Sequence, residues 1–188
     1  MADEKATKKL YIIISQTGTV LSRILKAITG AEYNHASIGL EGDLQYMYSF
    51  GRKNPYNPFW AGFVTESPNF GTFKRFPDTM VKIISIEIPS DKHEAISERI
   101  NYMLENKKQF GYNYWGLWLA WFKIVIKSKK RFYCSEFVKD ILVSYNIEGA
   151  DMLGDIPQPV HFLNIPNIYL EYTGKLKDYS AEFNKVHI

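Results

Sequence analysis

Residues 81–89 form the segment that most restricts the fold of this chain. Apolar residues occupy both faces of an extended strand here, at Val81, Ile83, Ile84, Ile86 and Ile88. Such a strand has to lie inside a sheet that is covered on both sides. A second apolar, β-branched run at residues 10–15 predicts another buried strand. With 46% apolar residues, the chain can bury a sizeable core around this sheet.

Three segments show the spacing of a helix with one apolar face. The stripes are Val20, Leu21, Ile24, Leu25 and Ile28; Ala95, Ile96, Ile100, Met103 and Leu104; and Phe137, Val138, Ile141, Leu142 and Tyr145. Thr19 is a suitable N-cap for the first helix, and Ser90 and Asp91 for the second. His93 lies outside the second stripe and is expected to be solvated. Strands and helices together predict an α+β domain with an antiparallel sheet.

Residues 33–40 alternate as a strand with one core face. Ala36, Ile38 and Leu40 point one way, whereas His35, Ser37 and Gly39 point the other. The turn at residues 41–43 predicts a hairpin with a strand at residues 44–50. His35 stands at the head of the polar face among small residues, where a partner can approach. The alternative for His35 is an ordinary surface or hydrogen-bonded core histidine.

The remaining segments divide into an insertion and a tail. Residues 51–78 are rich in proline, glycine and aromatic residues and predict a structured loop insertion with short strands, suited to walling a groove. Residues 168–172 predict a final short strand, and residues 173–188 a polar tail. The 188 residues fit a single domain with its core at residues 10–170.

Charge, cysteine usage and motifs exclude several classes of function. The net charge of +3 is too small to indicate a nucleic-acid partner. One cysteine forms no internal disulfide and suits a reducing compartment. Residues 1–9 are polar, with no apolar segment of a signal peptide, so a cytoplasmic protein is expected. No motif for a metal or phosphate site occurs, and neither metal nor cofactor is predicted.

Cys134 begins the face of the third helix and therefore lies at or near a helix N-terminus. Unpaired N–H groups and the helix dipole there stabilise a thiolate and lower the pKa of the thiol. A thiolate is the nucleophile in cysteine catalysis. The alternative is a small buried apolar side chain. An imidazole brought to the thiol in space would take its proton and later return it to a leaving group.

An aromatic segment precedes the cysteine. Residues 112–126 contain Tyr112, Tyr114, Trp115 and further aromatic and aliphatic residues, but they are too few to span a bilayer. A buried or groove-forming helix is the main prediction. A helix that lies at a membrane surface is the alternative, with the basic run at residues 127–131 next to anionic lipid.

The chain resembles the circularly permuted papain-like hydrolases of the NlpC superfamily, the YiiX-type group. The resemblance rests on Asn34-His35-Ala36-Ser37-Ile38 followed by Phe132-Tyr133-Cys134-Ser135-Glu136-Phe137-Val138. Histidine precedes cysteine here, as in the permuted group. Supporting positions are Thr17-Gly18-Thr19, Tyr112-Asn113-Tyr114 where relatives tend to carry Tyr-Asp, and residues 157–159. The resemblance covers most of residues 10–170.

The resemblance implies roles for individual residues. Cys134 would be the nucleophile and His35 the general base and acid. A third polar residue, often a glutamate in this group, orients the histidine from the following strand. Ser49 occupies the matching place here, with Tyr48 or Glu41 as alternatives if the register differs. The Cys134 N–H would belong to the oxyanion hole, with its second donor unassigned.

The predicted substrate-binding residues lie around the cysteine motif: Tyr112, Tyr114, Trp115, Tyr133 and Ser135. Three functions follow from the resemblance. The first is an amidase or peptidase that cuts a peptide, isopeptide or cell-wall-type amide bond. The second is a lipid hydrolase or acyltransferase of the lecithin–retinol acyltransferase-like type. The third is a catalytically weak binding module on the same fold.

Overall fold

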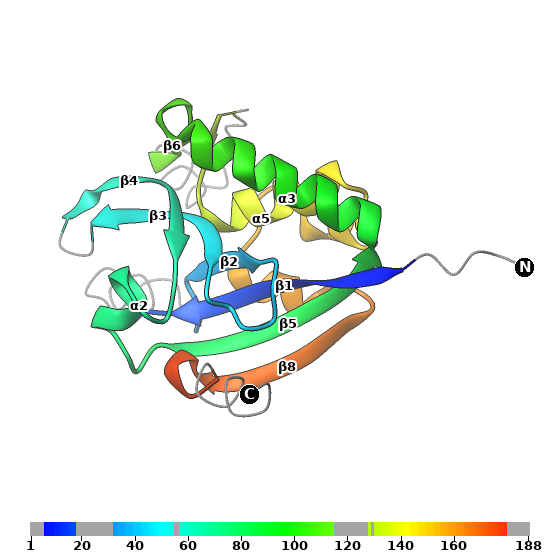
Figure 1. The fold of residues 1–188 in the computed structure, drawn as a ribbon, viewed down its shortest axis with the longest axis horizontal. Coiled ribbons are helices and arrows are strands. Elements are labelled where there is room, and N and C mark those ends of the chain that lie inside the picture. The colour runs from blue at the N-terminus through cyan, green and yellow to red at the C-terminus, as the bar shows by residue number, and fades with distance from the viewer. Residues whose placement is uncertain (1–5, 18–31, 55–56, 115–127, 129, 180–188) are drawn as a thin grey trace, which may run out of the picture.

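The computed structural model describes residues 6–17, 32–54, 57–114, 128 and 130–179. Its described strands form one eight-stranded sheet in the order β7-β6-β4-β3-β2-β1-β5-β8 (Figure 1). Neighbouring strands are antiparallel except for β6 and β7, which are parallel. The strands are β1 (Thr7–Gln16), β2 (His35–Gly39), β3 (Met47–Asn54), β4 (Asn57–Glu66), β5 (Met80–Pro89), β6 (Gly111–Tyr112), β7 (Arg131–Phe132) and β8 (Ile168–Lys175).

Helices accompany the sheet, so the predicted α+β class is confirmed. They are α2 (Gly71–Arg75), α3 (Ser90–Glu105) and α5 (Cys134–Ser144), with the 3₁₀ helices η1 (Lys107–Gln109), η2 (Ala150–Leu153) and η3 (Pro159–Asn164). β5 lies between β1 and β8 and is apolar on both faces, as its sequence predicts. The hairpin of β2 and β3 is also observed.

The two faces of the sheet carry separate cores. The larger core joins alternate residues of β1 and β2 to the stripes of α3 and α5, which lie above β1 and β5 in Figure 1. The smaller core lies on the opposite face, where Ile13 and Ile83 pack with Leu44, Phe73 and Leu176. Because side chains alternate along a strand, His35 and Ser37 share the face of the smaller core, whereas Ala36 and Ile38 face α5.

The prediction of a loop insertion at residues 51–78 is wrong for its central part. Residues 57–66 form the ten-residue strand β4, which pairs with β3 from Met47↔Glu66 to Asn54↔Asn57. Pro58 lies near the start of this strand, where a missing N–H is tolerated. β4 is therefore an interior strand between β6 and β3. From its end, the Glu66 side chain reaches His35 of β2.

The predictions for His93 and for the C-terminal tail differ from the structure. His93 is buried rather than solvated, because its Nε2 lies 3.0 Å from the Leu40 carbonyl oxygen. The last strand continues to Lys175, and Leu176 is buried, so the predicted tail at 173–188 begins with ordered sheet and core. The predicted helix at residues 20–28 lies outside the described residues, as do residues 115–126 of the helix predicted at 112–126, whereas Tyr112 belongs to strand β6. Within the described part of the chain, every helix is too short or too polar to cross a membrane.

Candidate active site

Cys134 is the first residue of α5, at the helix N-terminus that its spacing predicts. A cluster of aromatic rings fixes this end of the helix against the sheet. The Phe50 ring of β3 lies 5.3 Å from Phe132 and 5.5 Å from Phe137, and Phe63 of β4 lies 5.5 Å from Phe137. Aromatic contacts at these separations add to the burial energy. The segment around the thiol is therefore held firmly on β3 and β4.

A carboxylate closes the first turn of α5. The Glu136 carboxylate accepts hydrogen bonds from the Tyr133 N–H and from the Asn113 amide, both at 3.2 Å. The Asn113 N–H donates to the Phe132 carbonyl oxygen at 3.0 Å. The pKa of the Glu136 carboxyl is raised, because burial outweighs these two hydrogen bonds. This network ties β6 and β7 to the helix that carries the thiol.

The thiol lies beside the first residues of β2. β2 and β3 pair only at Ile38↔Tyr48 and Gly39↔Met47, so the first residues of β2 are not paired with β3. Cys134 Sγ donates to the Asn34 carbonyl oxygen at 4.0 Å, and the Ala36 N–H helps to lower the pKa of the thiol. The sulfur thus contacts the backbone on either side of His35, although α5 packs on the opposite face of the sheet.

His35 connects the thiol to a buried carboxylate. Its Nε2 lies 3.0 and 3.1 Å from the two carboxylate oxygens of Glu66, and interactions with Glu66 and with the Cys134 sulfur both raise the pKa of its ring. Because Nε2 faces the carboxylate, Nδ1 is the nitrogen left for the thiol. The side chains of His35 and Glu66 are only 14% and 12% exposed, so water screens this pair little.

The three groups shift one another toward their charged forms. Burial disfavours the imidazolium, but the charges and hydrogen bonds of Glu66 and Cys134 outweigh it and raise the pKa of His35 from 6.5 to about 10. Burial likewise opposes ionisation of Cys134 and Glu66. The His35 charge nevertheless lowers the pKa of both groups. The contacts therefore favour the thiolate, the imidazolium and the carboxylate over their neutral forms.

Glu66 is itself held in place by its neighbours. The Ser37 hydroxyl donates to its carboxylate at 2.6 Å. Gly51 lies against the carboxylate, because a Cβ built there would be 3.3 Å from Glu66 Oε1. A glycine on β3 leaves the space in which the carboxylate reaches from β4 toward β2. The position of Glu66 thus depends on three neighbouring strands.

The structure gives His35 a different partner from the one predicted. Ser49 is fully buried on the same face. Its hydroxyl forms no hydrogen bond of good geometry within the described residues. The hydroxyl does help to lower the pKa of the Glu66 carboxyl. Tyr48 faces the larger core, and Glu41 lies in the turn after β2. Neither hydrogen-bonds His35 among the described residues. The prediction failed because it assigns residues 57–66 to a loop, whereas they form strand β4. One signal was present, since Glu66 is the only acidic residue between Asp43 and Asp78.

The predicted substrate-binding residues occupy different environments. Tyr112 is half-buried beside Cys134, and burial followed by the nearby thiolate raises the pKa of its hydroxyl well above the ordinary value. Tyr114 is exposed, and its hydroxyl accepts the Ala61 N–H at 2.8 Å. Tyr133 and Ser135 are buried, and Ser135 Oγ lies 3.9 Å from the sulfur. Trp115 lies outside the described residues.

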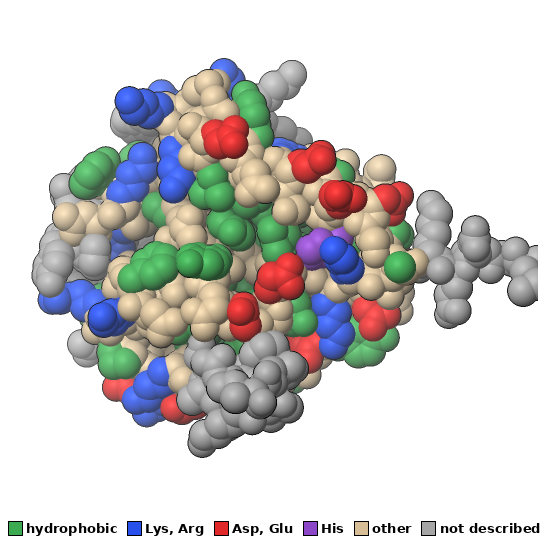
Figure 2. All heavy atoms as spheres, viewed as in Figure 1, with side chains coloured by type: hydrophobic (Ala, Val, Ile, Leu, Met, Phe, Trp, Pro, Cys, Tyr) green, Lys and Arg blue, Asp and Glu red, His purple; other side chains and the backbone are tan. Residues whose placement is uncertain are grey.

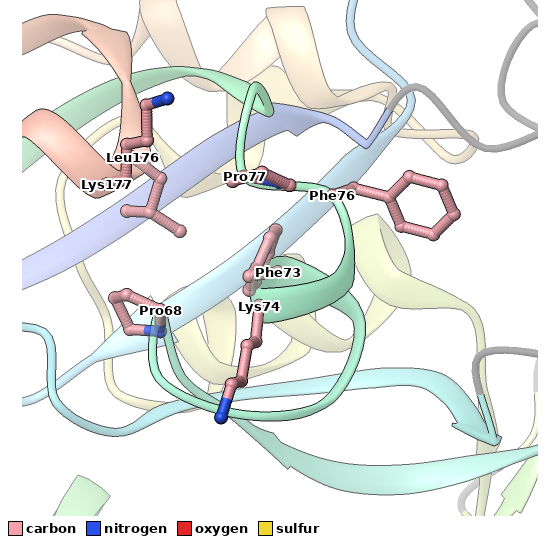
Figure 3. Close-up of a pocket in the computed structure, with 7 residues that line it drawn as sticks. All are labelled: Pro68, Phe73, Lys74, Phe76, Pro77, Leu176 and Lys177. Atoms are coloured by element: carbon pink, nitrogen blue, oxygen red, sulfur yellow. The ribbon is translucent and has the colours of Figure 1, made fainter.

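Other parts of the described structure offer less chemistry. Its His, Cys, Asp and Glu residues include no group of three that could hold a metal ion. A small pocket lies between α2 and Leu176, and Figure 3 shows Phe73 and Pro68 around it, with the Phe76 ring turned away. A second pocket lies between η2 and η3. Cys134 lines neither pocket, and the first contains no nucleophile or carboxylate.

At the N-terminus of α5, a thiol, an imidazole and a carboxylate are connected in series within an α+β domain. A scan against protein-family models, a search of curated proteins and a search of solved structures each give no match to this chain.

Proposed function

We propose that this chain is a thiol-dependent hydrolase of the amidase or peptidase type, with the permuted papain-like fold of the YiiX-type group. The observation that carries the proposal is the series of contacts from Cys134 through His35 to Glu66. A buried thiol with only a structural role needs neither an imidazole nor a carboxylate beside it. Perturbed ionisation of this kind is typical of reactive sites.

Each residue has a defined part in the proposed reaction. The Cys134 thiolate attacks the carbonyl carbon of an amide, and the carbonyl oxygen takes the negative charge. The Cys134 N–H has no partner within the helix and can donate to that oxygen. His35 then gives its proton to the leaving nitrogen, so the C–N bond breaks and a thioester remains. Water, deprotonated by His35, attacks the thioester and releases the acid and the thiol.

Glu66 acts through His35 in this scheme. Its carboxylate fixes the ring so that Nδ1 faces the sulfur, and it stabilises the imidazolium that the resting state requires. The hypothesis of a weak binding module arose from Ser49 in the orienting position. A buried carboxylate in that role removes the reason for expecting poor turnover.

The reactivity of Cys134 tests the proposal. Iodoacetamide is neutral, so its rate against pH reports the thiolate fraction. We expect the wild type to react with an apparent pKa well below the free-thiol value of about 8.5, and His35→Ala to restore the ordinary value. His161→Ala is the control, because His161 lies on η3, where its Nδ1 accepts the Gln158 N–H. Slow, unshifted alkylation in the wild type would contradict the proposal.

Lipid hydrolysis or acyl transfer remains the second candidate. It is favoured by the aromatic and basic sequence at residues 112–131, within which Lys130 and Arg131 are exposed. Co-sedimentation with vesicles containing anionic lipid separates the two candidates. Retention of the wild type on such vesicles, lost in Lys130→Gln/Arg131→Gln, would favour the lipid substrate.

A further inference from the structure

A half-buried arginine lies on β3 next to the proposed reaction centre. Arg52 pairs with Ala61 of β4 and points to the face that carries α5, as Phe50 does two residues earlier. The Phe50 ring contacts Phe132 and Phe137, which flank Cys134 in sequence. The side chain that follows Phe50 on this face is therefore adjacent to the N-terminus of α5.

The β6 segment places a tyrosine between Arg52 and the thiol. β4 and β6 pair at Gly62↔Gly111, and the Tyr114 hydroxyl accepts the N–H of Ala61, the residue opposite Arg52. The ring centroids of Tyr112 and Tyr114 are 4.8 Å apart. Glu66 and Tyr112 partly oppose the lowering of the Arg52 pKa by burial, and Cys134 contributes, after burial, to the raised pKa of the Tyr112 hydroxyl. Arg52, Tyr112 and Cys134 thus form one edge of the site.

The guanidinium is not required to neutralise Glu66. That carboxylate already accepts hydrogen bonds from Ser37 and pairs with His35, and among the described residues it forms no ion pair with Arg52. Burial lowers the pKa of Arg52, but a guanidinium stays charged in proteins. Keeping a guanidinium half-buried costs desolvation free energy, which an anionic ligand would offset.

We infer that Arg52 binds a carboxylate of the substrate close to the scissile amide bond. The inference rests on the proposed function and names its substrate class: an amide whose acyl or leaving part carries a carboxylate. A single planar guanidinium matches one carboxylate through two parallel hydrogen bonds. The adjacent Lys53 lies over Gly62 on the other face of the strand, so Arg52 is the cation that β3 presents on the face of α5.

The surface charge agrees with an anionic substrate. In Figure 2, Lys and Arg side chains gather mainly over the left part of the molecule, where β3 and β4 lie in Figure 1. Asp and Glu side chains gather mainly over the centre and right. An anionic substrate would therefore be attracted to the part of the molecule that contains β3, the strand that carries Arg52.

Two alkylating reagents that differ by one charge test the inference. N-iodoacetylglycine and N-iodoacetylglycinamide share their reactive carbon, but only the first ends in a carboxylate. The measured quantity is the ratio of their alkylation rates with Cys134, relative to the same ratio with 2-mercaptoethanol. We expect a raised ratio in the wild type and a drop of about tenfold in Arg52→Gln, since the lost hydrogen bonds involve two charges. Arg52→Lys should keep part of the preference.

Lys53→Gln is the matched control, because it removes the same charge from the neighbouring residue on the opposite face; its ratio should equal that of the wild type. The inference is overturned if Arg52→Gln keeps the wild-type ratio. It is equally overturned if that variant slows both reagents alike, since Arg52 would then act only on the catalytic groups. Failure of the proposed function appears separately, as an ordinary pKa in the iodoacetamide profile. Circular dichroism and the Tm verify that each variant is folded.

Discussion

Two glutamates on the sheet are held by the same set of partners but in different surroundings. Glu66 on β4 accepts the Ser37 hydroxyl at 2.6 Å and pairs with His35 at 3.0 Å. Glu171 on β8 accepts the Ser85 hydroxyl at 2.5 Å and pairs with Lys9 at 2.7 Å. Each carboxylate thus has one serine and one cation. In both cases the pKa of the carboxyl is lowered despite some burial.

The difference lies in the cation and its exposure. Lys9 is 41% exposed and would be charged at neutral pH without its partner. Its ion pair therefore fastens β1 to β8 at the surface and does little else. His35 is buried, becomes an imidazolium only because of its neighbours, and contacts a thiol. A serine–carboxylate–cation group is suited to proton transfer when its cation is titratable and contacts a nucleophile.

Replacing each carboxylate by its amide should separate the two sites most widely. Glu66→Gln leaves His35 buried without its counter-ion, so we expect the free energy of unfolding to fall by about 3 kcal/mol. Glu171→Gln should cost less than about 1 kcal/mol, because water and salt screen the Lys9 pair. Urea titrations at pH 6 measure both changes.

The same two variants separate structure from chemistry. Cys134 alkylation at pH 7 should slow by about tenfold or more in Glu66→Gln, since a weaker imidazolium returns the pKa of the thiol toward its ordinary value. Glu171→Gln should leave the rate unchanged. Equal alkylation in the two variants would mean that Glu66 only stabilises the fold.

The pH dependence of stability should distinguish the two ion pairs. The folded pKa of His35 is raised from 6.5 to about 10, so its contribution is complete below pH 6.5 and is lost as the pH rises toward 10. The folded pKa of Glu66 is lowered, so its contribution is complete above the unfolded value of about 4.3 and is lost as the pH falls through the folded value. Both contributions are therefore complete only between about pH 4.3 and 6.5.

Unfolding free energies at pH 5.5, 7.5 and 9.5 measure this window. We expect the difference between the wild type and Glu66→Gln to shrink by about 2 kcal/mol or more from pH 5.5 to 9.5. The corresponding difference for Glu171→Gln should stay nearly flat there, because Lys9 keeps its proton with a raised pKa. A flat profile for Glu66→Gln would contradict a titrating His35.

The elements that carry the thiol and the imidazole could be predicted because each follows a local rule. The apolar stripe of α5 places Cys134 at a helix start, and the alternation in β2 places His35 opposite Ala36. Both patterns lie within a few residues of the site. The interior position of β5 follows in the same way from its apolar composition on both faces.

The partner of His35 could not be predicted, because it depends on register between strands that are distant in sequence. Glu66 reaches His35 only if residues 57–66 form a strand, pair with β3 at Met47↔Glu66, and meet a glycine at Gly51. Proline and glycine obscured the strand pattern. His93 illustrates the same limit, since its burial depends on the Leu40 carbonyl oxygen of another segment.

The serines provide the finest distinction between the two carboxylate sites. Ser37→Ala removes a hydrogen bond to a buried charge and should lower the free energy of unfolding by about 1.5 to 3 kcal/mol. Ser85→Ala removes a similar bond to the more exposed Glu171 carboxylate and should cost about 1 kcal/mol. Ser49→Ala should have the smallest effect, because its buried hydroxyl forms no good hydrogen bond to lose. Urea titrations of the three variants give this order. A larger loss in Ser49→Ala than in Ser37→Ala would mean that Ser49, rather than Ser37, holds the Glu66 carboxylate in solution.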